Sequence, residues 1–320
     1  MSEPVEVYDV QLGESEVNPN SLKLDELNDD VLKMIVRRLD FKSTRCLRKV
    51  CWNLRLITDC VRPALREIFT DYCFRDHVYT CFDRTHVAYS NLQREFRWYN
   101  GPLCKLVKTE DYMEAALEDL FRALKYSKLQ LNSLRINFDD SWENLPKAYW
   151  RQSLINSFMK SLNHQISVKH FHLVWRHRGD AVAILSHLKP GTLERIELFY
   201  DAYTPVVEMD ELVELEQCKQ AKSFSVNGLV RTPIVRFLSF KNFDITCHSV
   251  SVQDLLSVRD ILAETPRQQR PKFDISWKSR MSIDNLREAL QLDEDGKYEI
   301  PNSDEVLKFL ISTSSIKFSP

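Results

Sequence analysis

The chain has 320 residues, of which 43% are hydrophobic and 28% are charged. These values are typical of a folded protein with room for two domains, and they exclude a disordered chain. The formal net charge of −2 excludes a strong overall attraction to nucleic acid or to an acidic membrane surface. No apolar run approaches the roughly 18 residues of a membrane-spanning helix, so we expect no membrane partner.

The first 20 residues are rich in acidic side chains, and we expect residues 1–20 to form a flexible acidic tail. The segment lacks the basic and apolar stretches of a secretory signal, so the sequence predicts a cytoplasmic or nuclear location, or both. Eight cysteines are present and no two are spaced as CxxC, which indicates reduced thiols. We therefore expect no disulfide framework, no metal site and no cofactor.

An apolar segment begins at Leu27, directly behind the tail. Asn28 is a good N-cap, and the apolar residues that follow recur at helical spacing up to Pro63. They indicate one helix (Val31, Leu32, Ile35 and Leu39) and then two shorter ones (Leu47, Val50, Leu54 and Ile57). A unit of about 40 residues cannot bury both stripes by itself. The segment therefore packs on the rest of the chain or on another protein, and the pattern leaves both possibilities open.

Basic residues are frequent between Lys33 and Arg66. Because they alternate with apolar residues at helical spacing, they indicate the solvated face of amphipathic helices. Nucleic-acid binding by these basic helices is the alternative interpretation.

Alternating apolar and polar residues between 76 and 108 predict a small antiparallel sheet. An amphipathic helix is predicted over residues 110–128, because its apolar side chains recur on one side.

Strand and helix patterns alternate from about Leu131 onward. Short strands are predicted to begin at Leu134, Phe171, Ile196 and Phe224, with helical stretches between them, and two further strand–helix units follow to about residue 290. Such units predict parallel strands, arranged either as a leucine-rich-repeat-like solenoid or as an ordinary α/β sheet. The irregular spacing of the strands favours a degenerate solenoid.

The alternation along each strand predicts which side chains face the core. The core set is Leu134, Ile136, Phe138, Phe171, Leu173, Trp175, Ile196 and Leu198. The outward set includes Arg135, Asn137, His172, Glu197 and Phe199. The outward set is chemically mixed, which is typical of a protein-binding surface, although a solvated sheet face has the same pattern.

The sequence carries no signature of an enzyme. None of its six glycines lies in a GxGxxG or P-loop arrangement, and no GxSxG motif is present. We assign no side chain a catalytic role.

The apolar positions of the first segment resemble the F-box in order and spacing: Leu27, Asp30, Val31, Leu32, Ile35, Leu39, Leu47, Val50, Cys51 and Leu54. Asn28 stands where the F-box usually has Pro, and Trp52 directly follows Cys51. The stretches "RKVCWNLRLITD" and "FLSFKNFDITCHSVSVQDLLSVRDIL" resemble the F-box A family, which is expanded in nematodes and carries a C-terminal FTH domain.

The resemblance implies an α+β or α/β protein in four parts. These are the tail (1–20), a three-helix F-box (21–65), a connecting antiparallel sheet and helix (66–128), and an FTH-like strand–helix repeat domain (129–320).

The resemblance also implies a non-catalytic substrate receptor. The F-box would dock on a Skp-type adaptor, and through it on a cullin, of a ubiquitin ligase. The adaptor contacts carried over by position are Leu27, Asn28, Val31, Leu32, Ile35, Leu39, Leu47, Val50 and Leu54. The C-terminal domain would hold an unidentified target protein, and we assign that role to Arg135, Asn137, His172, Glu197 and Phe199. The alternative is a regulatory interaction module whose degenerate F-box no longer binds the ligase.

Overall fold

The computed structural model describes residues 27–39, 41–61, 65–72, 77–83, 85–91, 105–127, 129–138, 145–175, 178–200 and 206–320. The predicted acidic tail lies outside these residues. The chain divides into two compact units, Met1–Pro63 and Ala64–Pro320, which we call the helical unit and the sheet unit.

The helical unit contains three short helices: α1 (Asp29–Arg38), α2 (Phe41–Leu47) and α3 (Trp52–Cys60). The Asn28 side chain accepts a hydrogen bond of 2.8 Å from the backbone N–H of Asp30 and so caps α1. Acidic residues in the first turn of α1 and basic residues in its last turn match the direction of the helix dipole. The prediction of one helix followed by two shorter ones is confirmed.

The sheet unit is built on one mixed sheet of 14 strands, whose order is β12-β13-β14-β11-β10-β9-β7-β6-β5-β1-β2-β3-β4, with β8 paired to β9. The strands are β1 (Glu67–Asp71), β2 (His77–Phe82), β3 (Thr85–Ser90), β4 (Lys105–Lys108), β5 (Gln130–Asn137), β6 (Ser167–Trp175), β7 (Arg195–Tyr200), β8 (Val206–Val207), β9 (Ser223–Val230), β10 (Asn242–Cys247), β11 (Lys272–Trp277), β12 (Lys297–Glu299), β13 (Val306–Ser312) and β14 (Ser315–Phe318).

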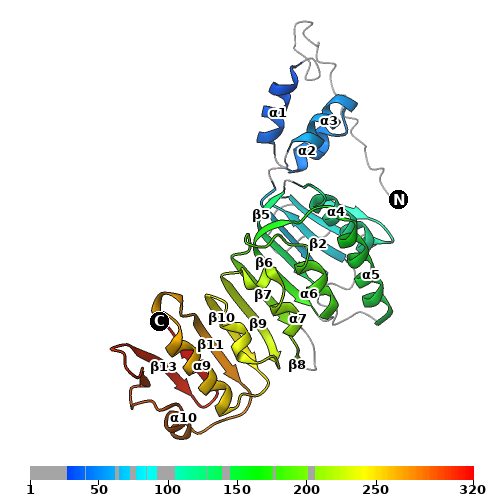
Figure 1. The fold of residues 1–320 in the computed structure, drawn as a ribbon. Helices are drawn as coiled ribbons and strands as arrows, with labels where there is room; N and C mark the ends of the chain where they lie inside the picture. Colours follow the sequence, from blue (N-terminus) through cyan, green and yellow to red (C-terminus); the bar gives the residue numbers. More distant parts are fainter. Residues whose placement is uncertain are drawn as a thin grey trace, which may run out of the picture. The chain divides into compact units, whose positions relative to one another are not determined.

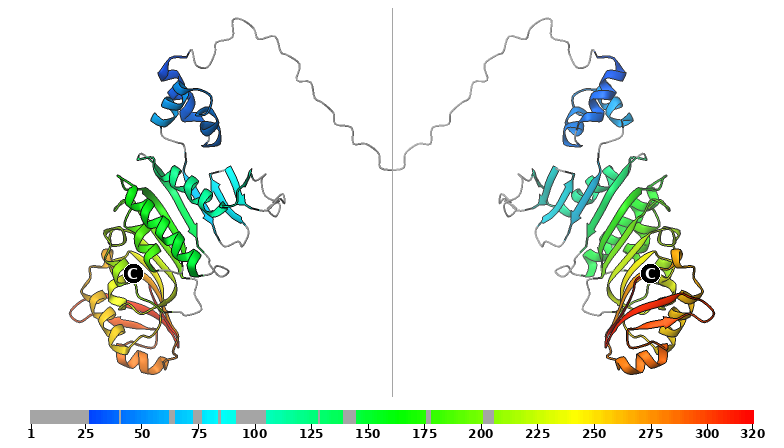
Figure 2. Two further views of the ribbon diagram at one scale, coloured as in Figure 1. Left: turned by 90° about the vertical axis from the view of Figure 1, so that its right-hand side faces the viewer. Right: turned by 90° about the vertical axis from the view of Figure 1, so that its left-hand side faces the viewer.

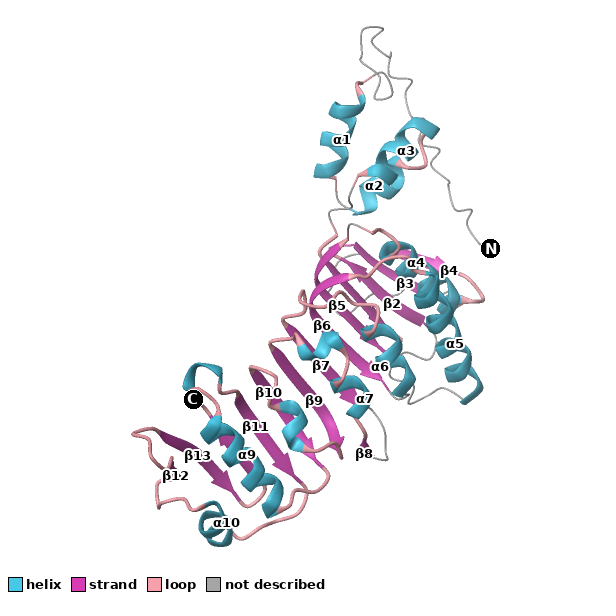
Figure 3. Ribbon diagram, in the orientation of Figure 1, coloured by secondary structure: helices cyan, strands magenta, loops and turns pink. Residues whose placement is uncertain are grey.

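Helices connect the strands of the central part. They are α4 (Tyr112–Leu124), α5 (Leu145–Ser161), α6 (Arg178–Leu185), α7 (Asp210–Val213), α8 (Glu216–Lys219), α9 (Val252–Glu264) and α10 (Ile283–Leu290), with 3-10 turns η2 (Ile234–Phe237) and η3 (Arg267–Gln269). Strands β5, β6, β7, β9, β10 and β11 are parallel neighbours in chain order. Figures 1 and 3 show α4, α5, α6, α7 and α9 on the same face of these strands, and Figure 2 gives two side views. The predicted strand–helix alternation is confirmed from β5 to α10. The predicted repeat does not extend to residue 320, because β12, β13 and β14 follow one another without helices and pair antiparallel.

The predicted small antiparallel sheet is not a separate sheet. Strands β1, β2 and β3 are antiparallel neighbours, but β1 also pairs in parallel with β5, and β4 pairs in parallel with β3. These strands therefore form the end of the large sheet. Local alternation reveals a strand but not its partner, which lies 66 positions further along the chain in the pair Phe69↔Arg135.

The core of the sheet unit lies between the strands and the helices that cover them. All eight side chains predicted to face inward, from Leu134 to Leu198, are at most 1% exposed. Further along, the rings of Phe243, Phe273 and Phe318 continue this layer from strand to strand, with centroids 5.2 and 5.6 Å apart. The opposite face of these strands carries polar and charged side chains, and we call it the open face.

Candidate functional site

The helical unit has its own small core. It consists of Leu32, Val36, Leu54, Ile57 and Val61, with Leu27, Leu47 and Cys51 packed partly against it. These side chains belong to the two apolar stripes seen in the sequence, so part of each stripe is used to hold the three helices together.

Other large apolar side chains of the same unit remain exposed. They are Val31, Met34, Val50, Trp52 and Leu56, with exposed fractions between 43% for Val31 and 70% for Trp52. Exposed large apolar side chains on so small a unit are typical of one that binds another protein. We call these five residues the apolar patch.

The nine predicted adaptor contacts therefore fall into three groups. Leu32 and Leu54 are in the core; Leu27, Ile35, Leu39 and Leu47 are half-buried; Asn28, Val31 and Val50 are exposed. Their role in adaptor binding stays a prediction.

Met34, Trp52 and Leu56 were not singled out from the sequence. A signal was present, because Met34 lies three positions after Val31, and Leu56 four positions after Trp52, on adjoining turns of the same helix. The stripe of core-facing residues is the stronger pattern on each helix, so the exposed apolar pairs were overlooked.

The five predicted target-binding residues lie on the open face of the sheet unit. Register places Arg135 beside His172 and His172 beside Glu197. One row further along, Asn137 pairs with Val174, and Val174 with Phe199. The fold thus brings all five together from three neighbouring parallel strands, although their contact with a target stays a prediction.

His172 links the two rows. Its Nδ1 lies 3.2 Å from a carboxylate oxygen of Glu197, and its ring centroid lies 4.8 Å from that of Phe199. Arg195 also reaches Glu197, at 3.4 Å. Glu197 thus lies between the His172 ring and the Arg195 guanidinium, and these contacts hold the three side chains in one arrangement on the sheet.

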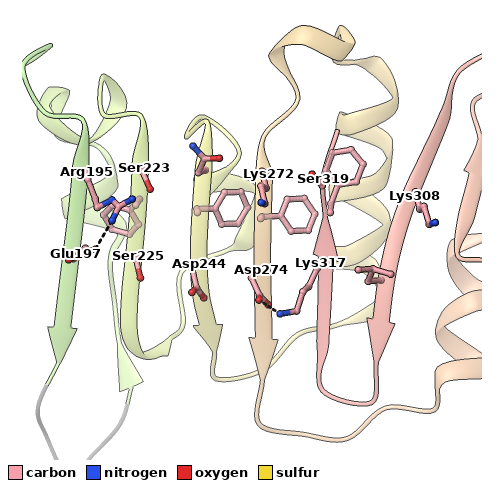
Figure 4. Close-up of a pocket in the computed structure, with 16 residues that line it drawn as sticks. Arg195, Glu197, Ser223, Ser225, Asp244, Lys272, Asp274, Lys308, Lys317 and Ser319 are labelled. Carbon is pink, nitrogen blue, oxygen red and sulfur yellow. Dashed lines mark hydrogen bonds and ion pairs between the residues drawn. The ribbon is translucent and has the colours of Figure 1, made fainter. Parts of the chain in front are cut away.

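The open face continues into a hollow of about 930 Å³ over strands β7, β9, β10, β11, β14 and β13. Figure 4 shows its polar side chains along neighbouring strands, with a helix behind the sheet. Register extends the row of Glu197 through Ser225, Asp244, Asp274 and Lys317.

Asp244 and Asp274 were missed in the sequence. Each is the second residue of a repeated stretch, Phe-Asp-Ile, at the start of a strand. The repeat could have shown that both carboxyl groups occupy the same position on adjacent strands.

The charges of the hollow are only partly paired. Lys317 forms an ion pair and hydrogen bond with Asp274, which raises the pKa of Lys317. Burial, and after it repulsion from Asp274, raises the pKa of Asp244 above its usual value, although Lys317 acts in the opposite direction. Asp244 is therefore an acidic group without an ion-pair partner among the described residues.

The described residues do not present a reactive centre. Burial raises the pKa of Cys218 and of Cys247 to about 12, so neither thiol is a nucleophile at neutral pH. Among the residues that the structure describes, no group of three or more potential ligands could hold a metal ion. No helix within them is long and apolar enough to span a membrane.

Comparison with known families finds two matching segments. Residues 24–69 match the model described as the F-box domain, and residues 152–293 match the model described as the FTH domain. This pair of domains is typical of nematode FTH/F-box A proteins. A search of curated proteins finds no match.

Proposed function

The chain is an F-box protein of the type that carries a C-terminal FTH domain, and we propose that it is a substrate receptor of a Skp–cullin–F-box ubiquitin ligase. The single observation that carries the proposal is the apolar patch, which remains exposed on the unit that matches the F-box domain. The chain itself is non-catalytic in this proposal, and the transfer of ubiquitin belongs to partner subunits. We place it in the cytoplasm or the nucleus, where such ligases work.

The apolar patch is the centre of the proposed adaptor interface. Trp52, which is 70% exposed, is its largest side chain, and aromatic anchors of this kind carry much of the free energy of protein association. The half-buried residues among the predicted contacts, such as Ile35 and Leu39, would complete the interface around it. Leu32 and Leu54 act indirectly, because they hold α1 and α3 in place.

The open face is the proposed target-binding surface. Parallel strands that follow one another in chain order, with helices on one face, support our further proposal that the strand–helix units are coils of a degenerate leucine-rich-repeat-like solenoid. In such an arrangement the strands line an accessible surface. Arg135, Asn137, His172, Glu197 and Phe199 would then contact the target.

Calorimetry of the full chain with a purified Skp-type adaptor tests the docking. We expect 1:1 binding with a micromolar or tighter dissociation constant and a negative heat-capacity change, because apolar surface is buried. Val31→Asp and Trp52→Ala are expected to weaken binding at least about tenfold, which corresponds to roughly 1.4 kcal/mol.

Val252→Asp is the matched control. Val31 and Val252 are exposed to 43% and 40% and both lie in the first turn of a helix, where a new carboxylate is tolerated by the helix dipole. The control should bind like the wild type. Unchanged binding by both patch variants would overturn the proposed interface, and no binding by the wild type would favour the regulatory module with a degenerate F-box.

A further inference from the structure

The hollow on the open face carries two parallel rows of opposite charge. Carboxylates of Glu197, Asp244 and Asp274 form one row, which ends at Lys317 and which we call the acidic row. Arg195 and Lys272 lie two positions before Glu197 and Asp274 on the same strands. The strand register continues this second row through Ser319, which follows β14, to Lys308 on β13. We call Arg195, Lys272 and Lys308 the basic row.

The two rows are close enough to contact one ligand together. Residues two apart on a strand share a face and are separated by about 7 Å. Figure 4 shows Arg195 with Glu197 on β7, and Lys272 with Asp274 on β11. Neighbouring strands are spaced by about 5 Å, so the two rows of opposite charge run side by side across the strands.

The charges of the hollow are not fully neutralised within the protein. Arg195 pairs with Glu197 at 3.4 Å, and Lys317 pairs with Asp274. Within the described part of the chain, Asp244, Lys272 and Lys308 form no ion pair. Lys297, the ion-pair partner of Asp295 at 2.8 Å, is the main cause of the lowered pKa of that carboxyl, and Lys308 adds a smaller effect in the same direction. An acidic group in one row and two basic groups in the other are therefore available to a ligand.

Uncharged polar side chains lie between and beside these charges. They are Ser223, Ser225, Asn242 and Ser319. Hydroxyl and amide groups of this kind can donate to and accept from the backbone of a polypeptide. Leu310, which is 64% exposed, adds an apolar contact at the end of the hollow.

From this arrangement we propose that the hollow binds an extended segment of the target protein in which acidic and basic residues alternate. Successive side chains of an extended chain point to opposite sides. A segment lying across the strands would direct its acidic side chains to Lys272 and Lys308 and its basic side chains to Asp244. This inference rests on the proposed function, because it takes the open face as the target-binding surface.

Other ligands match the charges less well. A nucleic-acid backbone or a wholly acidic peptide would satisfy the basic row but would be repelled by three carboxylates. A wholly basic peptide would be repelled by the basic row, because like charges placed together oppose binding. These ligands are therefore direct competitors in the test.

The experiment measures binding of fluorescent eight-residue peptides to the full chain by anisotropy at low salt. The probes are an Asp-Lys repeat, a peptide of the same composition with four Asp followed by four Lys, all-Asp, all-Lys, and a single-stranded oligonucleotide. We expect the alternating peptide to bind at least about fivefold more tightly than each of the others. Equal binding of the block peptide, tighter binding of any other probe, or no binding of the alternating peptide would overturn the proposal.

Variants identify the site. Asp244→Asn and Lys272→Gln together should weaken binding of the alternating peptide at least fivefold. Asp304→Asn and Lys278→Gln remove one acid and one lysine that are exposed outside the hollow, and this control should bind as the wild type does. If the control loses as much affinity as the hollow variant, binding is a general charge effect and the proposal is wrong.

Adaptor binding separates this proposal from the function on which it rests. The hollow variant should bind the Skp-type adaptor like the wild type, because its substitutions lie in the sheet unit. A chain that binds the adaptor but prefers no alternating peptide would leave the receptor role intact and remove this inference. A chain that binds the peptide but not the adaptor would contradict the receptor role instead.

Discussion

Asp244 and Asp274 show how the same residue in the same local sequence acquires a different charge environment. Both follow a buried phenylalanine and lie side by side on β10 and β11. Asp274 has Lys317 as an ion-pair partner on the next strand, whereas Asp244 has Ser225 on its other side. The neighbours across the sheet, and not those along the chain, therefore set the difference.

This environment predicts the titration of Asp244. Its pKa should lie above the usual value because burial and Asp274 both disfavour the carboxylate. The charged groups facing it are Asp274 on β11 and Lys317 on β14; on its own strand Asn242 and Thr246 share its face. We expect Asp274→Asn to lower the pKa of Asp244, and Lys317→Met to raise it, in carbon-detected NMR titrations of the carboxyl group.

The sign of the linked stability effect follows from the raised pKa. The folded chain holds this proton more tightly than the unfolded chain, so the contribution of Asp244 to the free energy of unfolding falls as pH rises through its folded pKa. Asp244→Asn should therefore increase stability slightly at neutral pH, by less than about 0.5 kcal/mol because the site is partly exposed. A pKa at or below the usual value would contradict this account.

At the scale of elements, caps and turns determine where each helix and each hairpin begins or ends. Ser251 and Asp254 form a reciprocal capping box at the start of α9, and Ser282 caps α10. The hairpin of β12 and β13 depends instead on Gly296, which has a φ of +77°. The backbone N–H of Phe309 donates a hydrogen bond of 2.8 Å to the carbonyl of Gly296.

Gly296→Ala should destabilise this hairpin strongly. A Cβ at Gly296 would lie 2.3 Å from the carbonyl oxygen of Phe309, whereas a Cβ at Gly191, with a similar φ, would meet only the side chain of Gln220 at 3.2 Å. Gly191→Ala is therefore the matched control, and its cost should be the roughly 1–2 kcal/mol of left-handed backbone. Denaturant unfolding should show a larger loss for Gly296→Ala, and equal losses would contradict the predicted clash.

At the scale of the whole molecule, the helical unit and the sheet unit each have a buried core of their own. The first matches the F-box domain, and the second contains the residues that match the FTH domain. This division suits a receptor that binds its ligase through one unit and its target through the other.

Residues 64–320 alone should therefore fold. We expect the thermal transition of this fragment, followed by circular dichroism, to lie within about 4 °C of the corresponding transition of the full chain, a difference equivalent to roughly 1 kcal/mol. The fragment should keep peptide binding in the hollow and lose adaptor binding. An unfolded or aggregated fragment would show that the sheet unit needs residues 1–63.

Much of the fold was predictable because the relevant signals are local. The 3.6-residue period identified α1 and α4, and the two-residue period identified the inward set around Phe171 and Ile196. The pairing of β1 with β5 was not predictable in this way, because it joins segments separated by many residues. The outward set on β5, β6 and β7 followed from alternation, while Asp244 and Lys317 joined the same face only through strand order.

The sequence by itself determined the three N-terminal helices, the strand–helix order of the central part, the side of its strands that faces the core, and the family to which the two domains belong. These properties depend on residues that are near one another along the chain, so periodicity and motif spacing contain them. Tertiary structure alone decided that Leu32 is buried while Val31 is exposed, and that acidic and basic side chains from four strands form two rows. Such properties depend on which surfaces meet, and packing and strand register settle that only when the whole chain is folded.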